Sequence, residues 1–143
     1  MMEERQDMPA GRLSEHFDWE EMIYSETAEK QAIRNMPDDE SRRSVEALVK
    51  RTLEPLRQAY GAPVRISSGY RCPELNTRVG GKPSSQHTKG EAADCTAGDI
   101  LQLLGVLLAH KIPFDQAILY RKRNFLHLSL RKEWNRGQVI IHD

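Results

Sequence analysis

The chain has 143 residues, 21 basic and 21 acidic side chains, and a formal net charge of zero. This length fits one domain with a sizeable core and no disulfide support, and the balanced charge excludes a global field that would draw the protein to nucleic acid or an anionic membrane. We therefore expect one monomeric domain over residues 14–143, preceded by a flexible polar tail over residues 1–13.

Targeting signals and cysteines are the next features that limit the interpretation. The polar, acidic start of the chain has no apolar stretch behind it that could serve as a signal peptide, and no run of about 18 apolar residues occurs. We expect a soluble protein made in the cytoplasm, with no export signal and no membrane partner. Cys72 and Cys95 are expected to be reduced, with Cys95 in the core and Cys72 in a loop where it could be exposed.

The first half of the chain predicts helices. Residues 14–22 offer cap residues and an apolar patch for a short docked helix, and residues 25–28 could cap a second short turn. Apolar residues at helical spacing over residues 40–60 predict the first main helix. Pro55 lies inside this helix, and we expect it to cause a kink or an early end near Leu53.

The second half predicts strands around one buried helix. Residues 68–89 read as a long loop rich in glycine, proline and small polar residues, a place where function often lies. The expected strands are residues 64–67, 116–120, 125–130 and 138–141, and the expected helix is residues 100–110. Helices first and strands mostly later favour an α+β domain, with a small, mostly antiparallel sheet backed by helices.

A histidine and an aspartate flank a glycine turn at the end of the long loop. His87 and Asp94 lie seven residues apart around Gly90, and such a turn can direct both side chains at one ion. Zinc accepts histidine nitrogen and carboxylate oxygen, and a catalytic zinc site uses three protein ligands with a fourth position left open. A third ligand is therefore needed.

The strand over residues 125–130 offers that ligand. Strand alternation puts its leucines on one face and His127 on the other. If the leucines pack on the buried helix, His127 lies on the side where His87 and Asp94 could join it. By spacing alone two alternatives stay open: His87 with Asp94 could form a surface turn, and His127 could be a hydrogen-bonded strand histidine.

Several ordered blocks carry a family resemblance. They are Ser68-Gly69-Tyr70-Arg71, Leu75-Asn76, Val79-Gly80-Gly81, Ser85-Gln86-His87, Gly90-Glu91-Ala92-Ala93-Asp94, Phe114-Asp115-Gln116 and Phe125-Leu126-His127-Leu128-Ser129. Together they resemble the signature of peptidase family M15, the zinc D-Ala-D-Ala carboxypeptidases, which also include phage endolysins and D,D-dipeptidases. The nearest subgroup looks like the small M15 proteins of bacterial genomes and prophages. The resemblance implies a fold of the hedgehog and D-Ala-D-Ala-peptidase type.

The resemblance also implies roles for individual residues. It makes His87, Asp94 and His127 the ligands of one Zn²⁺ ion, and it makes Arg71 the anchor for a substrate carboxylate or carbonyl. It places Ser85, Gln86 and Tyr70 in the same pocket as substrate-binding residues. A simple surface ion pair between Arg71 and Glu74 is the alternative for the arginine.

The sequence departs from the family at the general base. Many members carry Glu or Asp three residues before the last histidine, where this chain has Asn124, and others carry an acid just after the first hairpin strand, where it has Tyr120-Arg121. A neutral amide cannot accept the proton. Asp115 is the first remaining candidate and Glu91 the second, although a carboxylate that starts a strand often caps a turn.

The resemblance implies a peptidoglycan stem peptide or a D-Ala-D-Ala-like substrate as the partner. The chain would cut it as a carboxypeptidase or as an endolysin-type endopeptidase, and would reach the cell wall after a phage-type release. The rival is a catalytically impaired, zinc-stabilised module that binds wall peptide or a protein partner. The missing acid at the Asn124 position supports that rival.

Overall fold

The computed structural model describes residues 7–143. Its α-helices are α1 (Trp19–Ile23), α2 (Glu26–Lys30), α3 (Asp39–Leu48), α4 (Glu54–Tyr60), α5 (Pro73–Arg78) and α6 (Ile100–Ala109). Its strands are β1 (Val64–Ser68), β2 (Ala92–Ala97), β3 (Gln116–Tyr120), β4 (Phe125–Ser129) and β5 (Gln138–His142). The expected α+β class is confirmed.

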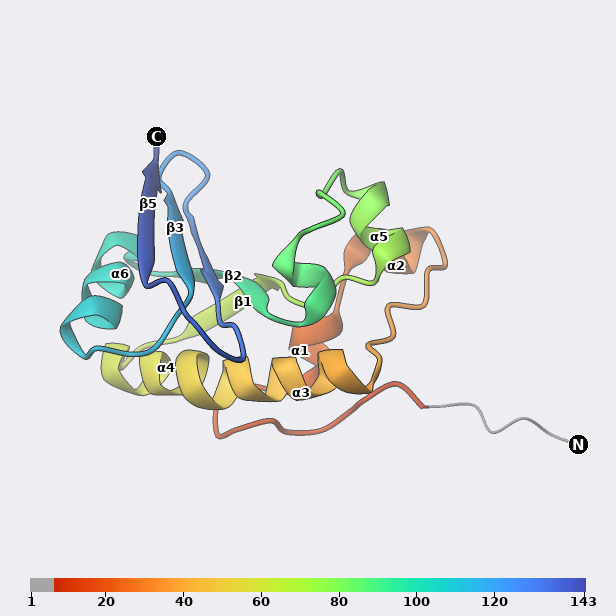
Figure 1. Cartoon of the computed structure of the whole chain (residues 1–143), viewed down its shortest axis with the longest axis horizontal. Coiled ribbons are helices and arrows are strands. Elements are labelled where there is room, and N and C mark those ends of the chain that lie inside the picture. Colours follow the sequence, from red (N-terminus) through yellow and green to blue (C-terminus); the bar gives the residue numbers. More distant parts are fainter. Residues whose placement is uncertain (1–6) are drawn as a thin grey trace, which may run out of the picture.

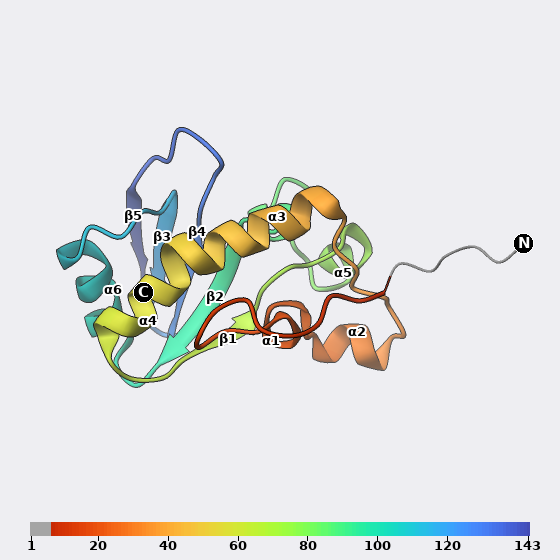
Figure 2. The ribbon, with the colours of Figure 1, turned by 90° about the horizontal axis from the view of Figure 1, so that it is seen from below.

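The strands form one sheet in the order β1-β2-β4-β3-β5. All neighbours are antiparallel except β3 and β5, which run parallel. In Figures 1 and 2 the long α3–α4 helix crosses one side of the sheet, and α6 lies beside it near α4. Helices α2 and α5 lie together at the other end of the molecule, and α1 lies between them and β1 (Figures 1 and 2). The sheet therefore has a helix-backed face and a face that can carry a site.

The main helix runs past its proline. A π-helical turn, η1 (Val49–Leu53), joins α3 to α4, and Pro55 lies in the first turn of α4. Because proline lacks an N–H and its ring crowds the preceding turn, the wider π turn accommodates it without breaking the helix. The helix does not end near Leu53, one of the two expected outcomes; it ends at Gly61, whose φ of 74° is left-handed.

The core lies between the sheet and its helices. Leu126, Leu128 and Leu130 are buried on the face that α6 contacts, as the strand alternation predicts. Cys95 is fully buried in the same core, as expected. Cys72 is also buried, which corrects the expectation that it could be exposed: it directly precedes α5, and its backbone N–H donates to Asn35 Oδ1.

The segment over residues 68–89 contains two helical elements that the sequence did not predict. Helix α5 and the 3₁₀ turn η2 (Gln86–Lys89) both lie within residues 68–89, where only a loop was expected.

Strand β2 was not predicted from the sequence, because Ala92–Ala97 contains mostly small residues and few of the β-branched or aromatic residues that mark strands. Its pairing with β1 and β4 on either side determines its structure.

The N-terminal tail is partly described. Residues 1–6 lie outside the described residues, so that part of the expected tail stays a prediction. Within the described part, the backbone N–H of Leu13 donates to Phe17 at 3.0 Å, and Gly11 accepts a bond from Trp19 at 2.9 Å. These bonds attach the end of the tail to α1.

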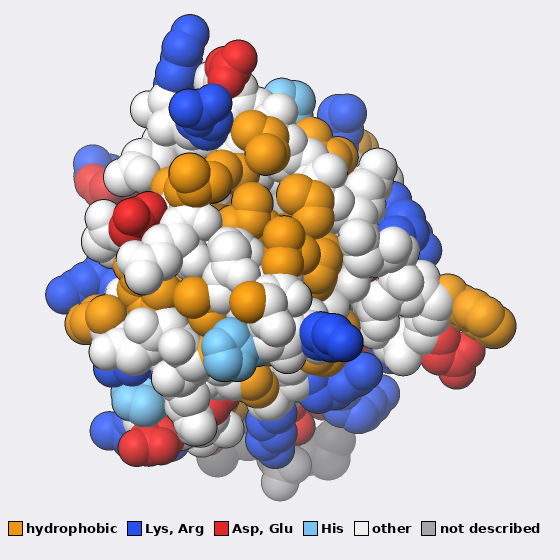
Figure 3. All heavy atoms as spheres, turned by 90° about the vertical axis from the view of Figure 1, so that its left-hand side faces the viewer, with side chains coloured by type: hydrophobic (Ala, Val, Ile, Leu, Met, Phe, Trp, Pro, Cys, Tyr) orange, Lys and Arg blue, Asp and Glu red, His pale blue; other side chains and the backbone are white. Residues whose placement is uncertain are grey.

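One face of the molecule carries an apolar patch. Figure 3 views the molecule from the side of α6 and β5 and shows hydrophobic side chains gathered there. The exposed apolar residues of these elements are Leu101, Leu108, Val139 and Ile141. Among residues 7–143, no helix has the length and apolar character that a membrane span requires.

Candidate metal centre

The three sequence-predicted ligands meet at one point. One donor atom from each of His87, Asp94 and His127 lies within 4.8 Å of the other two. Asp94 and His127 are cross-strand partners on β2 and β4, so their side chains leave the same face of the sheet. His87 comes from η2, and its ring lies edge-on to that of His127 at a centroid distance of 5.1 Å.

Gly90 makes the turn between the first two donors. It has a φ of 73°, and a side chain there would overlap the carbonyl oxygen of Ser41 in α3. Glycine is therefore required both for its backbone conformation and for the close approach to the helix. The turn leads directly from η2 into β2, so it sets the position of His87 relative to Asp94.

A hydrogen bond to the backbone fixes the tautomer of His87. Its Nδ1 lies 2.7 Å from the carbonyl oxygen of Gly69, so Nδ1–H donates there and Nε2 keeps a free lone pair. That Nε2 lies 3.4 Å from Asp94 Oδ1, and His127 Nδ1 lies 2.9 Å from the same oxygen. Burial raises the pKa of Asp94, but the hydrogen bond from His127 and the closeness of both imidazole groups outweigh it and hold the pKa well below its ordinary value.

This donor set suits zinc. Two imidazole nitrogens and one carboxylate oxygen are ligands that zinc prefers, and three protein ligands leave a position for substrate or water. His87 is 3% exposed, which places one ligand at the base of the site, while Asp94 and His127 are half-buried and reachable. The residues present fit a catalytic type of metal centre.

Two cavities flank the donor set. The first, which we call the Asp94 cavity, measures about 470 Å³ and includes Ser67, Ser68, Phe125 and Tyr24 in its lining. The second, the His127 cavity, measures about 390 Å³ and has a strongly basic lining. Arg71 lines both cavities. An extended ligand could therefore pass over the donor set from one cavity into the other.

Arg71 lies at the junction of the two cavities, and no acidic side chain among residues 7–143 forms an ion pair with it. Its backbone N–H donates to His87 at 3.1 Å, and its Nη2 lies 3.5 Å from Ser85 Oγ. Its Nε is buried and has no hydrogen-bond partner among residues 7–143. Glu74, the alternative partner, pairs with Arg78 instead. A side chain that lines both cavities and keeps one donor unpaired is consistent with a ligand-binding role.

Of the other expected pocket residues, one positions His87 and two line the cavities. Ser85 caps η2, and its Oγ accepts from the backbone N–H of His87 at 3.2 Å, so it orients that ligand. Gln86 lines the His127 cavity. Tyr70 is buried, donates to the Met36 carbonyl at 3.3 Å, and borders the Asp94 cavity. Its burial raises the pKa of the phenol to about 12, so it stays protonated.

Asn35 positions Arg71, a role that no sequence motif indicates. Its Nδ2 donates to the carbonyls of Ile23 at 2.8 Å and Tyr70 at 2.9 Å, and its Oδ1 accepts from Cys72 N–H at 2.7 Å. The side chain, 4% exposed, thus holds the backbone on both sides of Arg71. An asparagine followed by Met-Pro reads only as a chain break, because its partners are remote in sequence.

The structure does not place Asp115 beside the two histidines. The side chain is fully buried and accepts from Arg136 Nη2 at 2.7 Å, Arg136 Nε at 3.0 Å and Gln86 Nε2 at 3.1 Å. Hydrogen bonds from Arg136 outweigh burial and lower the pKa of Asp115 to about 2. So weak a base is poorly matched to proton transfer near neutral pH, and its role as general base stays a prediction.

Glu91, the second candidate base, borders the His127 cavity together with His127 itself. It is half-buried, and its Oε1 accepts from Gln86 Nε2 at 3.3 Å. Gln86 thus donates to both candidate carboxylates, Glu91 and Asp115. Of the two, Glu91 is the one in contact with the cavity.

The conformation of the β3–β4 turn explains why Asn124 stands where many family members carry an acid. Asn124 is exposed at the β3–β4 turn with a φ of 58°, a left-handed conformation that asparagine tolerates better than glutamate. Arg121, at the other position where an acid was expected, is exposed and pairs with Asp143 at 3.6 Å. Local turn geometry thus accounts for the asparagine.

A second cluster of possible ligands has a structural explanation. Glu15, His16 and Glu54 also bring donor atoms within 4.8 Å of one another. Glu54 accepts from Ser14 Oγ at 2.6 Å, from His16 N at 2.7 Å and from His16 Nδ1 at 2.8 Å. These bonds fasten the N-terminal segment to α4 and satisfy the carboxylate without a metal.

A His–Asp–His donor set that two cavities make accessible has the ligands of a catalytic metal site for hydrolysis. The comparison with protein families agrees with this chemistry. The chain belongs to the Peptidase M15 family, whose profile matches residues 15–129. No curated protein matches the chain.

Proposed function

We propose that the protein is a zinc-dependent peptidase that hydrolyses peptide bonds of peptidoglycan, as a D-Ala-D-Ala carboxypeptidase or as an endolysin-type endopeptidase. The observation that carries the proposal is the convergence of His87, Asp94 and His127 within 4.8 Å, in a chain of the Peptidase M15 family. A bound zinc ion would supply Lewis-acid polarisation of the substrate carbonyl.

The surrounding residues have separate tasks in this proposal. His87 is held by Gly69 in the tautomer that offers Nε2. Arg71 would bind a carboxylate or carbonyl oxygen of the substrate through its guanidinium group, which lines both cavities. Glu91 would act as the general base and accept a proton from the attacking water, because its side chain borders the His127 cavity. Asp115 is instead bound by Arg136.

The layout of the cavities favours an endopeptidase. Space on both sides of the donor set, lined partly by the shared Arg71, accommodates a chain that continues beyond the cut bond in both directions. A carboxypeptidase needs room on one side only for a terminal residue. Chromatography of digested wall fragments distinguishes the two, because an endopeptidase releases longer products than single amino acids.

Metal content and turnover test the proposal. The purified protein should contain about one zinc ion per chain, and His87→Ala should lose both the zinc and the hydrolysis of wall fragments. His110→Ala is the matched control, since that histidine is exposed and lies outside the donor set. Absence of stoichiometric zinc after zinc loading, or loss of zinc in both variants, would refute the proposed centre.

The base is tested separately. Glu91→Gln should lower turnover by about 100-fold or more while zinc content and thermal stability stay nearly unchanged, the usual effect of removing a positioned base. Unchanged turnover in this variant would remove Glu91 from the mechanism.

The rival function is a zinc-stabilised module that binds wall peptide or a protein partner without cutting it. The exposed Asn124 and Arg121 at the expected acid positions favour it. Stoichiometric zinc and measurable peptide binding, without any hydrolysis of wall fragments, would support this rival over the peptidase.

A further inference from the structure

The His127 cavity concentrates positive charge in a chain whose formal net charge is zero. Its basic lining residues are Arg71, Lys82, Lys89, Arg131 and Arg136. The acidic side chain in the same lining is Glu91. A cleft lined by one sign of charge attracts ligands of the opposite sign.

Two of these arginines are held by a buried carboxylate. Asp115 accepts Arg136 through both Nε and Nη2, and also the backbone N–H of Arg136 at 2.9 Å. Arg131 Nε lies 3.4 Å from the same carboxylate. Asp115 is 0% exposed, whereas the side chains of Arg131 and Arg136 are 45% and 41% exposed. The carboxylate therefore fixes the inner side of both guanidinium groups and leaves their outer nitrogens accessible.

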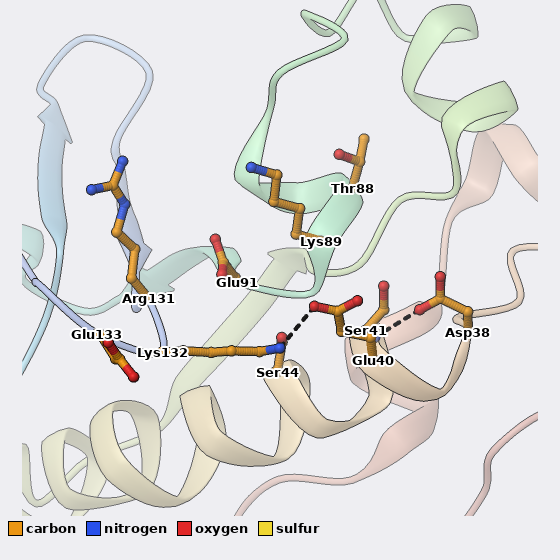
Figure 4. A pocket seen from close by; sticks show the side chains of 10 residues that line it. All are labelled: Asp38, Glu40, Ser41, Ser44, Thr88, Lys89, Glu91, Arg131, Lys132 and Glu133. Atoms are coloured by element: carbon orange, nitrogen blue, oxygen red, sulfur yellow. Dashed lines mark hydrogen bonds and ion pairs between the residues drawn. The ribbon is translucent and has the colours of Figure 1, made fainter.

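The loop that carries the two arginines is fastened at further points. The N–H of Arg131 donates to Asn135 Oδ1 at 2.7 Å, and Asn135 Nδ2 donates back to the carbonyl of Arg131 at 3.2 Å. Lys132 pairs with Glu40 of α3 at 2.7 Å. In Figure 4, Lys132 reaches toward Glu40, while Arg131 and Lys89 point away from α3 together with Glu91. The arginines are thus presented in advance of binding.

The outer guanidinium nitrogens have no acceptor within the described part of the chain. Beyond the bonds to Asp115, no acceptor among residues 7–143 binds Arg136 Nη1 or the Nη atoms of Arg131. Even after Asp115 and Glu91 are counted against the five basic residues, the region keeps an excess of positive charge. A planar guanidinium group with free N–H donors matches a carboxylate in geometry and charge.

We propose that the His127 cavity is a subsite for a carboxylate group of an acidic peptide, bound by Arg131 and Arg136 beside the metal centre. The peptide nature of the ligand rests on the proposed function. This carboxylate is distinct from one bound by Arg71, because Arg131 and Arg136 belong to the β4–β5 loop, whereas Arg71 lies just before α5. Asp115 is a positioning residue for the subsite.

The test uses the zinc-loaded full chain and capped peptides. Acetylated and amidated D-alanine pentapeptides carry one D-glutamate at each position in turn, and a matched set carries D-glutamine. The caps remove the terminal carboxylate that Arg71 could bind. Binding is measured by fluorescence anisotropy of dye-labelled peptides, and hydrolysis of the same peptides by chromatography.

At one position or more, the glutamate peptide should bind about 10-fold more tightly than its glutamine partner, and added salt should reduce the difference. Arg131→Gln should abolish most of this preference, and Arg136→Lys should weaken it, since lysine keeps the charge but loses the fork. Arg121→Gln removes the same charge from the exposed hairpin turn and should leave the preference intact.

Failure of the subsite can be distinguished from failure of the proposed function. Hydrolysis of both peptide sets without a glutamate preference would keep the peptidase and overturn the subsite. A glutamate preference that depends on Arg131, without hydrolysis, would keep the subsite and overturn the peptidase. Equal loss of preference in Arg131→Gln and Arg121→Gln, or no binding of any peptide, would also overturn the subsite.

Discussion

Replacement of Asp115 by asparagine tests whether this residue is a structural clamp for Arg131 and Arg136 or a catalytic base. The carboxylate is fully buried, and its pKa falls from 3.8 to about 2. A pKa lowered by about 2 units corresponds to about 2.5 kcal/mol of stability at neutral pH. Asparagine also turns an N–H₂ group toward the donors of Arg136, so we expect a total loss of about 2–3 kcal/mol.

The loss should appear as a melting temperature lowered by about 6–10 °C at pH 7, followed by circular dichroism. Because the folded pKa of Asp115 is depressed, its stabilisation is fully present above the unfolded pKa and is lost as the pH falls from about 4 to 2. The wild type and the Asp115→Asn variant should therefore approach each other in stability near pH 2.

Glu133→Gln is the matched control for this substitution, since Glu133 is an exposed acid on the β4–β5 loop that carries Arg131 and Arg136. It should leave the melting temperature nearly unchanged. An Asp115→Asn variant with wild-type stability at pH 7 and turnover lowered by about 100-fold would refute the clamp and restore Asp115 as the general base.

Two further substitutions test how the site is positioned. Gly90→Ala should cost more than about 2 kcal/mol and weaken zinc binding, because Gly90 has a φ of 73° and a methyl group would meet Ser41. Gly105→Ala, in an exposed and open position of α6, should instead stabilise the fold by about 0.5–1 kcal/mol; equal denaturation midpoints of the two variants would contradict this reasoning. Asn35→Ala should cost about 2–3 kcal/mol and lower the affinity for substrate through Arg71, as calorimetry and peptide binding would measure; unchanged values for both would exclude its positioning role.

Local sequence was sufficient where one segment carries the whole signal. The alternation of leucines with His127 predicted which side of β4 enters the core, because successive strand residues face opposite sides. Helical spacing similarly found α6 and most of the α3–α4 helix. The ordered motifs singled out His87, Asp94 and His127, and the structure brings the three together.

Tertiary structure decided the features whose partners are distant along the chain. Ala92–Ala97 became a strand because β1 and β4 pair with it on both edges, despite its weak propensity. Asp115 reads from sequence as a candidate base, yet its environment is set by Arg131 and Arg136 from a loop that carries no local sign of the contact. Asn35 likewise acts on residues 35 and 37 positions away. A residue's type fixes the bonds it can make, but packing fixes which partners it meets and hence its pKa and its role.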